Sequence, residues 1–168
     1  MFVFDPDVGN RFRSMREGKC YCVQANEPKT VMANCGADNV NNGVNRIVDA
    51  NRYEWVSDPE QPLPQWVELK LQKPETLTSV SLAFDTDMVN PATSWSYKVP
   101  NPAKCVKDYT VEVFDGGKWI TVADVQENFM RKRNHSFAPV TAEKIRVTAK
   151  ETWGDPSARI MEIRAEKV

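Results

Sequence analysis

The chain has 168 residues, with 22 Lys or Arg against 23 Asp or Glu and 41% hydrophobic residues, so its formal net charge is -1. A chain of this length can bury enough apolar surface to fold as one domain without a metal or a disulfide. The charges are nearly balanced and form no basic block, which argues against a nucleic-acid partner. The apolar runs are far shorter than the roughly 20 residues that a membrane-spanning helix needs. We therefore expect one domain over residues 1–168, with an amino-terminal extension and the first strand in residues 1–30.

Short stripes of alternating apolar residues run along most of the chain. Successive side chains of a strand point to opposite faces, so apolar residues at every second position mark a strand with one buried face. Prolines such as Pro74 and Pro139 are expected between the strands, because proline lacks the amide donor of a sheet ladder. The stripes are Val67, Leu69 and Leu71; Val80, Leu82 and Phe84; Tyr109, Val111 and Val113; Ile120 and Val122; and Ile145, Val147 and Ala149.

A tight turn is predicted between the third and fourth stripes, at Asp115-Gly116-Gly117-Lys118. Glycine readily adopts the positive φ angles that short hairpin turns require. The helical period is weak throughout, although residues 39–48 are compatible with a short helical turn. A parallel sheet would need crossover helices, so the pattern predicts an all-β protein, an antiparallel sandwich or barrel.

The order of several motifs between residues 39 and 164 resembles the discoidin or coagulation-factor type C family, which includes many bacterial carbohydrate-binding modules. Each motif is weak alone, and their common order makes them fairly specific together. The resemblance implies a galactose-binding-like jelly roll, an antiparallel β-sandwich of about eight strands. The motifs are the asparagine-rich stretch 39–43 followed by Trp55; residues 65–71 with Lys73 and Pro74; residues 109–113 with the turn at 115–117 and Trp119; residues 144–147; and residues 160–163.

A narrower resemblance is to the carboxy-terminal domain of large bacterial FAD-dependent oxidoreductases. It rests on residues 84–87, 105–109, 152–154 and 160–164. This resemblance implies that the chain accompanies a catalytic domain, as part of a longer polypeptide or as a separate relative. No FAD site is expected in the chain itself, because it has no GxGxxG stretch that opens a helix.

The family resemblance also implies a metal site. Carbohydrate-binding members hold a structural calcium ion with an acid of the first loop and a glutamate near the last strand, which correspond here to Asn42 and Glu162. Asn42 lacks the charge of that acid, and Asp49 is the candidate to replace it as a ligand. A buried carboxylate needs a cation or several hydrogen bonds, so Arg46 is an equal alternative to calcium as the partner of Glu162. We expect at most one structural Ca²⁺.

Aromatic residues indicate where a ligand would bind, because a pyranose ring stacks its apolar C–H face on Trp or Tyr while polar side chains bond its hydroxyl groups. Trp55, Trp66 and Trp119 are predicted to pack in the core. Residues 87–104 are predicted to form a long loop, and such loops are often functional. We expect the ligand surface on this loop and the turn around Trp153, which is alternatively a plug between loops. The candidate ligand-binding residues are Trp95, Tyr97, Asn101, Trp153 and Arg159.

Groups that could catalyse a reaction are scarce. His135 is the only histidine, and it lies in a charged stretch where a surface position is expected. Asp85 and Asp87 are paired acids at a strand end, and glycoside hydrolysis needs two carboxylates. Anchoring of a loop is their expected role, because neighbours on the same face of a strand lie side by side rather than across a substrate.

Four cysteines, Cys20, Cys22, Cys35 and Cys105, either form disulfides or remain buried thiols. The single residue between Cys20 and Cys22 is shorter than the spacers of structural zinc sites, which argues against zinc.

We expect a non-catalytic module that binds a carbohydrate or another surface ligand and positions an attached or associated enzyme. The alternative is a structural or interaction domain that packs against a catalytic domain and has no small ligand of its own. A free-standing hydrolase ranks last. Exposed aromatic residues would favour the first reading, and a large flat apolar patch the second. An extracytoplasmic location, periplasmic or secreted, is slightly favoured, although the amino terminus lacks the apolar core of a signal peptide.

Overall fold

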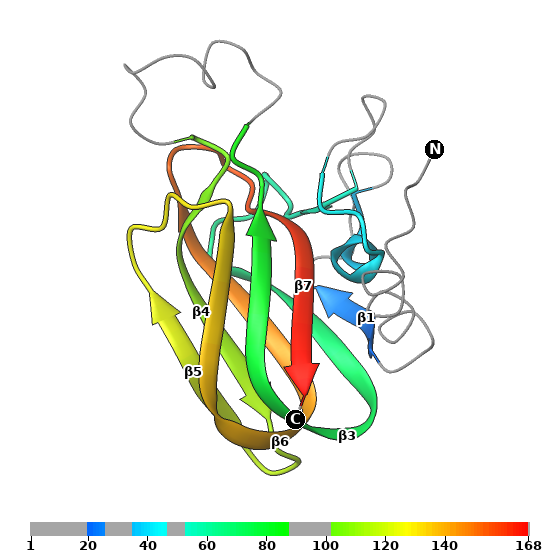
Figure 1. Cartoon of the computed structure of the whole chain (residues 1–168). Coiled ribbons are helices and arrows are strands. Elements are labelled where there is room, and N and C mark those ends of the chain that lie inside the picture. The colour runs from blue at the N-terminus through cyan, green and yellow to red at the C-terminus, as the bar shows by residue number, and fades with distance from the viewer. Residues whose placement is uncertain (1–19, 26–34, 47–52, 88–101, 168) are drawn as a thin grey trace, which may run out of the picture.

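The computed structural model describes residues 20–25, 35–46, 53–87 and 102–167, and within these residues the protein is almost entirely β (Figure 1). Side chains of residues 20–25 are outside this description. No helix in the described ranges is long and apolar enough to cross a bilayer. The elements are β1 (Cys20–Ala25), the 3-10 helix η2 (Ala37–Asn41), β2 (Trp55–Val56), β3 (Gln65–Phe84), β4 (Val106–Phe114), β5 (Trp119–Val125), β6 (Lys132–Thr152) and β7 (Arg159–Lys167).

Antiparallel ladders join these strands into one sheet with the order β2-β7-β3-β6-β4-β5, and β1 pairs with β3 beside this path. The sheet folds into two layers because β3 and β6 are long and belong to both. Residues 65–70 of β3 pair with residues 144–149 of β6 in the layer of β1, β4 and β5. Residues 79–83 pair with residues 132–136 in the layer of β2 and β7. The predicted antiparallel jelly-roll sandwich is confirmed.

Pro74 and Pro139 lie inside β3 and β6, not between strands as predicted. The register of the β3–β6 ladder shifts between Lys70 and Glu75 and again between Leu77 and Ser79. Both prolines fall at these interruptions, where the two strands bend from one layer into the other (Figure 1). A missing amide donor costs nothing there, because no ladder bond is made.

The predicted stripes form the core between the layers. The apolar residues of β3, β4 and β6 that were assigned to the buried face are buried, whereas Ile120 and Val122 of the edge strand β5 are only partly buried. Each fully buried aliphatic side chain stabilises the fold by about 1.5–3 kcal/mol. The predicted hairpin is also present: Asp115 Oδ1 accepts hydrogen bonds from the backbone amides of Gly117 and Lys118, both at 2.9 Å, and Gly116 has a φ of 90°.

Two of the three tryptophans predicted for the core lie elsewhere. Trp55 is buried, as expected, but Trp66 and Trp119 are only partly buried. Both rings flank the guanidinium of Arg146, whose carbon lies 4.9 Å from the centroid of Trp66 and 3.9 Å from that of Trp119. The alternation of side chains explains this, because Trp66 precedes the inward-facing Val67 and therefore points to the opposite face.

Candidate binding surface at the loop end

Several connections meet at one end of the sandwich, which we call the loop end (Figure 1). Backbone hydrogen bonds join them to one another: the amide of Trp153 donates to the carbonyl of Cys105 at 3.3 Å, and the amide of Ser57 donates to Ala158 at 3.0 Å. Loops held on a rigid sandwich are where binding residues usually concentrate. The loop end comprises residues 57–64, 85–87, 102–105, 126–131 and 153–158.

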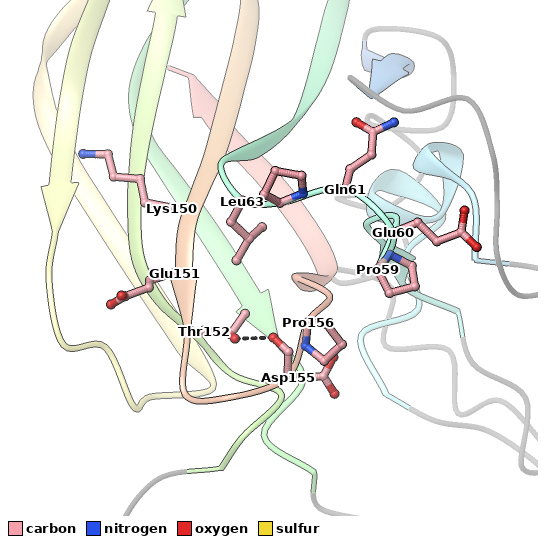
Figure 2. A pocket seen from close by; sticks show the side chains of 10 residues that line it. Pro59, Glu60, Gln61, Leu63, Lys150, Glu151, Thr152, Asp155 and Pro156 are labelled. Atoms are coloured by element: carbon pink, nitrogen blue, oxygen red, sulfur yellow. Dashed lines mark hydrogen bonds between the residues drawn. The ribbon is translucent and has the colours of Figure 1, made fainter.

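An open groove of about 600 Å³ lies at the loop end, between the β2–β3 connection and the end of β6 (Figure 2). Its walls alternate apolar rings and polar groups, which is the mixture that a sugar contacts. A hydrogen bond from the Thr152 hydroxyl to the carbonyl of Asp155 closes the turn at its floor. The lining residues are Pro59, Glu60, Gln61, Pro62, Leu63, Lys150, Glu151, Thr152, Asp155 and Pro156.

Trp153 follows the groove-lining Thr152, and its indole is anchored rather than free. The Nε1–H group donates a hydrogen bond of 2.6 Å to the carbonyl of Asn128, and the ring packs partly against the core. The ammonium of Lys107 lies 5.3 Å from the ring centroid. The indole therefore joins the β6–β7 turn to the β5–β6 connection.

Arg159 stands at the start of β7 and is engaged by two acids. Its guanidinium lies 3.4 Å from Glu54 Oε1 and 3.3 Å from Asp155 Oδ2. Only 9% of the Arg159 surface is exposed, and only 1% of Glu54. Asp155 also lines the groove, so this ion-pair network holds one of the groove-lining side chains.

Trp95, Tyr97 and Asn101, the remaining predicted ligand residues, lie outside the described residues. Both ends of their segment are fixed: an ion pair joins Asp87 to Lys104, and Asp85 Oδ1 accepts a 2.7 Å hydrogen bond from the amide of Asp87. Asp87 has a φ of 54°. The two aspartates thus hold the base of the segment, as expected for loop-anchoring residues.

Of the predicted metal ligands, Asn42 and Glu162 are described and Asp49 is not. Asn42 Oδ1 already accepts a 2.7 Å hydrogen bond from the amide of Val44. Glu162 is 8% exposed, and its two oxygens bond the Nδ2 group of Asn45 at 3.2 Å and the guanidinium of Arg164 at 2.8 Å. The cation beside Glu162 is thus Arg164.

Arg46, the predicted alternative partner of Glu162, is exposed. In the described part of the chain no group of three acidic, histidine or cysteine side chains is placed to hold a metal ion. A calcium ion at residues 39–49 would therefore depend on Glu162, on Asp49 and on amide and backbone carbonyl oxygens.

His135 is half-buried between the layers, not at the surface as expected. Its Nε2 atom lies 3.0 Å from the hydroxyl of the buried Tyr109, so it is a structural side chain. Cys35 and Cys105 are buried, and neither forms a disulfide. Burial raises the pKa of the Cys105 thiol to about 12, so the unreactive protonated form predominates.

One exposed pair at the loop end escaped the sequence analysis. Phe129 is 62% exposed and Met130 is 48% exposed, and they are the large hydrophobic residues found exposed in the described ranges. They lie in the β5–β6 connection, outside every strand stripe. The available sequence signal was that Phe129 and Met130 are adjacent and belong to no alternating apolar stripe. An apolar residue that no stripe buries can face solvent.

Most of the described fold lies within a match to a known protein family. A profile of the family described as NedA-like, galactose-binding domain matches residues 39–147. These residues run from η2 through β2, β3, β4 and β5 into β6, and therefore include most of both layers and most of the connections of the loop end. No curated protein matches the chain.

Solved structures with a similar fold include three family 32 carbohydrate-binding modules. The module of Streptococcus pneumoniae EndoD has 19% identity and a TM-score of 0.65, with 89% of this chain and 96% of that chain covered. The Clostridium perfringens NanJ module, solved with galactose, has 18% identity and a TM-score of 0.65, with 90% and 96% covered. A second C. perfringens module, solved with GalNAc-β-1,3-galactose, has 15% identity and a TM-score of 0.66, with 90% and 97% covered.

Proposed function

The chain belongs to the family of NedA-like galactose-binding domains, and from this membership we propose that it is a carbohydrate-binding module. It is not an enzyme by itself. The observation that carries the proposal is the family match over residues 39–147, and the likeness of the fold to modules solved with galactose and with GalNAc-β-1,3-galactose supports it. The ligand class we propose is therefore a galactose-type or related pyranose.

We place the ligand at the loop end, on the groove and the neighbouring segment 87–104. Trp95 or Tyr97 would stack on the apolar face of the sugar, and Asn101 would bond its hydroxyl groups. Trp153 would form a second wall beside the groove. Arg159 would act through Asp155, because its guanidinium pairs with that groove-lining carboxylate at 3.3 Å.

The proposal includes one structural calcium ion at residues 39–49, with Asn42, Asp49 and Glu162 as side-chain ligands. The ion would fix the loop beside η2 against β7, where Glu162 already bonds Asn45. It would have no part in contacting the sugar, and Arg164 would remain the second partner of Glu162.

The module would position an attached or associated enzyme on its carbohydrate, in an extracytoplasmic setting where polymeric carbohydrate is met. The alternative, an interaction domain that packs on an FAD-dependent oxidoreductase or another catalytic domain, calls for a broad apolar face. Within the described residues, Phe129 and Met130 alone are large, hydrophobic and exposed, and they are adjacent. This small patch favours the carbohydrate-binding proposal.

Isothermal titration of the purified chain with methyl β-galactoside, N-acetylgalactosamine and neutral galacto-oligosaccharides tests the proposal. We expect saturable binding that Trp95→Ala or Tyr97→Ala weakens about threefold to tenfold, the range that aromatic contacts contribute. The matched control is Phe114→Ala, which removes an aromatic residue from the far end of β4. Absence of binding to every sugar would overturn the proposal and leave the interaction domain as the better reading.

A further inference from the structure

The turn that carries Phe129 is unusually well fixed for an exposed connection. Asn128 is 1% exposed; its Nδ2 group donates to the carbonyl of Val106 at 2.9 Å, and its Oδ1 atom accepts from the amide of Met130 at 3.1 Å. The backbone amide of Asn128 donates to Lys107 at 2.8 Å. The fold therefore holds the backbone on both sides of Phe129 in a defined place, although 62% of the surface of Phe129 is exposed.

An exposed phenylalanine on a fixed turn does not contribute the stabilising free energy that burial of its ring would provide. A mobile turn could carry such a ring back onto the protein, but the bonds of Asn128 hold the backbone of the turn here. Exposed apolar side chains surrounded by polar groups are a mark of contact surfaces. An aromatic side chain on a fixed backbone has only two torsions to order, so it loses little conformational entropy when a ligand stacks on it.

A guanidinium borders this apolar pair. Arg133 Nη1 lies 4.0 Å from the Met130 sulfur, and within the described residues no carboxylate pairs with Arg133. The neighbouring lysines differ, because Lys104 pairs with Asp87 and Lys107 pairs with Glu151. Arg133 therefore differs from Lys104 and Lys107, because its charge is available for a ligand.

An apolar platform beside an unpaired guanidinium matches the chemistry of an acidic sugar. A pyranose ring offers a C–H face for Phe129 and Met130, and a uronic acid adds a carboxylate that the planar guanidinium binds with two parallel hydrogen bonds. We propose that Phe129, Met130 and Arg133 form a contact surface that selects uronic acids of the galactose type over the neutral sugar. This proposal rests on the proposed function and specifies the sugar class.

The surface adjoins the proposed ligand region rather than lying apart from it. The Asn128 carbonyl, one residue before Phe129, accepts the 2.6 Å hydrogen bond of the Trp153 indole. Trp153 in turn follows Thr152 of the groove. An oligosaccharide that occupies the groove can therefore extend past Trp153 to Phe129, and the acidic residue would be bound at that position.

The test compares two probes of equal length, a galactotriose whose terminal residue is galacturonate and neutral galactotriose, by titration calorimetry at about 0.15 M salt, where long-range attraction is screened. We expect the acidic trisaccharide to bind about tenfold more tightly, and Arg133→Gln to remove that preference without changing the affinity for galactotriose. Phe129→Ala should weaken binding of the acidic trisaccharide about threefold to tenfold. Lys118→Gln, in the hairpin at the far end, is the control for non-specific charge and should change nothing.

Each outcome separates this proposal from the proposed function. Equal affinity for both probes, or a preference that survives Arg133→Gln, overturns the acidic-sugar surface and leaves the carbohydrate-binding module intact. A preference that Lys118→Gln lowers equally overturns it as well, because the effect is then one of net charge. Binding of neither probe nor any neutral sugar overturns both proposals. Melting curves of Phe129→Ala and Arg133→Gln establish that the variants fold.

Discussion

The hydroxyl group of Tyr109 lies 3.0 Å from Nε2 of His135 in the interior between the two layers. Tyr109 is fully buried, and the centroid of its ring lies 5.0 Å from that of Phe84 and 5.7 Å from that of His135. Burial, and to a lesser degree the positive charge of Arg133, lowers the pKa of His135 below its ordinary value of 6.5. The folded protein therefore favours the neutral imidazole.

This pair predicts an acid-sensitive contribution to stability. The pKa of His135 is lower in the folded state than in the unfolded chain, so the unfolded state binds the extra proton first. The contribution is complete above pH 6.5 and is lost as the pH falls below 6.5 towards the folded pKa. Urea unfolding at pH 7.5 and pH 5 should therefore show a smaller loss of stability on acidification in His135→Gln than in the parent chain. Equal losses in both proteins would contradict the assignment.

How far the fold follows from the sequence depends on whether a signal is local. The buried stripe at Tyr109, Val111 and Val113 is visible because adjacent residues alternate, and the hairpin is visible because its glycines are consecutive. The continuity of β3 through Pro74 is not visible, because proline is normally a sign that a strand ends. Only the pairing with β6 shows that the strand continues into the second layer.

The site is less accessible to sequence reasoning for the same reason. The sequence predicts Arg159 as a hydrogen-bond donor for a ligand, yet its partner Glu54 is 105 residues away and cannot be recognised from any local pattern. Phe129 belongs to no stripe, and its exposure follows from the bonds of Asn128 to a different strand. The outward position of Trp66, in contrast, could have been predicted, because side chains alternate along a strand and the neighbouring Val67 faces inward.

The ion pair of Arg159 with Glu54 predicts a large loss of stability when the cation alone is removed. Glu54 is 1% exposed, and a buried carboxylate deprived of its cation costs about 3–5 kcal/mol. Arg159→Met should therefore lower the free energy of unfolding by about 3 kcal/mol in urea denaturation. The control is the double variant Glu54→Gln with Arg159→Met, which removes both charges and should be more stable than Arg159→Met alone. A double variant less stable than the single one would show that the pair is not the source of the loss.

The proposed calcium ion predicts a melting temperature that depends on the cation. A ligand that binds only the folded state stabilises it by about 2.7 kcal/mol at a hundredfold excess over its dissociation constant. Melting curves in calcium should therefore lie above those in chelator, and Glu162→Gln should abolish the difference. Asn45→Ala, which removes the other partner of Glu162, is the control that should retain part of it. Identical curves in calcium and chelator would indicate that Arg164 satisfies Glu162 without a metal.

The anchoring role and the proposed ligand-binding role of Trp153 can be tested separately. The Nε1–H group makes the anchoring hydrogen bond, whereas the ring would contact the ligand. Trp153→Phe removes the Nε1–H donor to Asn128 together with the five-membered ring that carries it, and the lost hydrogen bond should cost about 1 kcal/mol of stability. A six-membered aromatic ring remains, so the affinity for a galacto-oligosaccharide should stay within about threefold of the parent value.

Trp153→Ala removes the ring as well, and the affinity should then fall about tenfold, measured well below the melting temperature of the variant. The difference between the two variants isolates the ring, because both lack the anchoring hydrogen bond. If Trp153→Ala lowers stability but binds the sugar as tightly as Trp153→Phe, the indole is a plug between the β5–β6 and β6–β7 connections. The stacking surface of the loop end then has to be sought at Trp95, Tyr97 or Phe129.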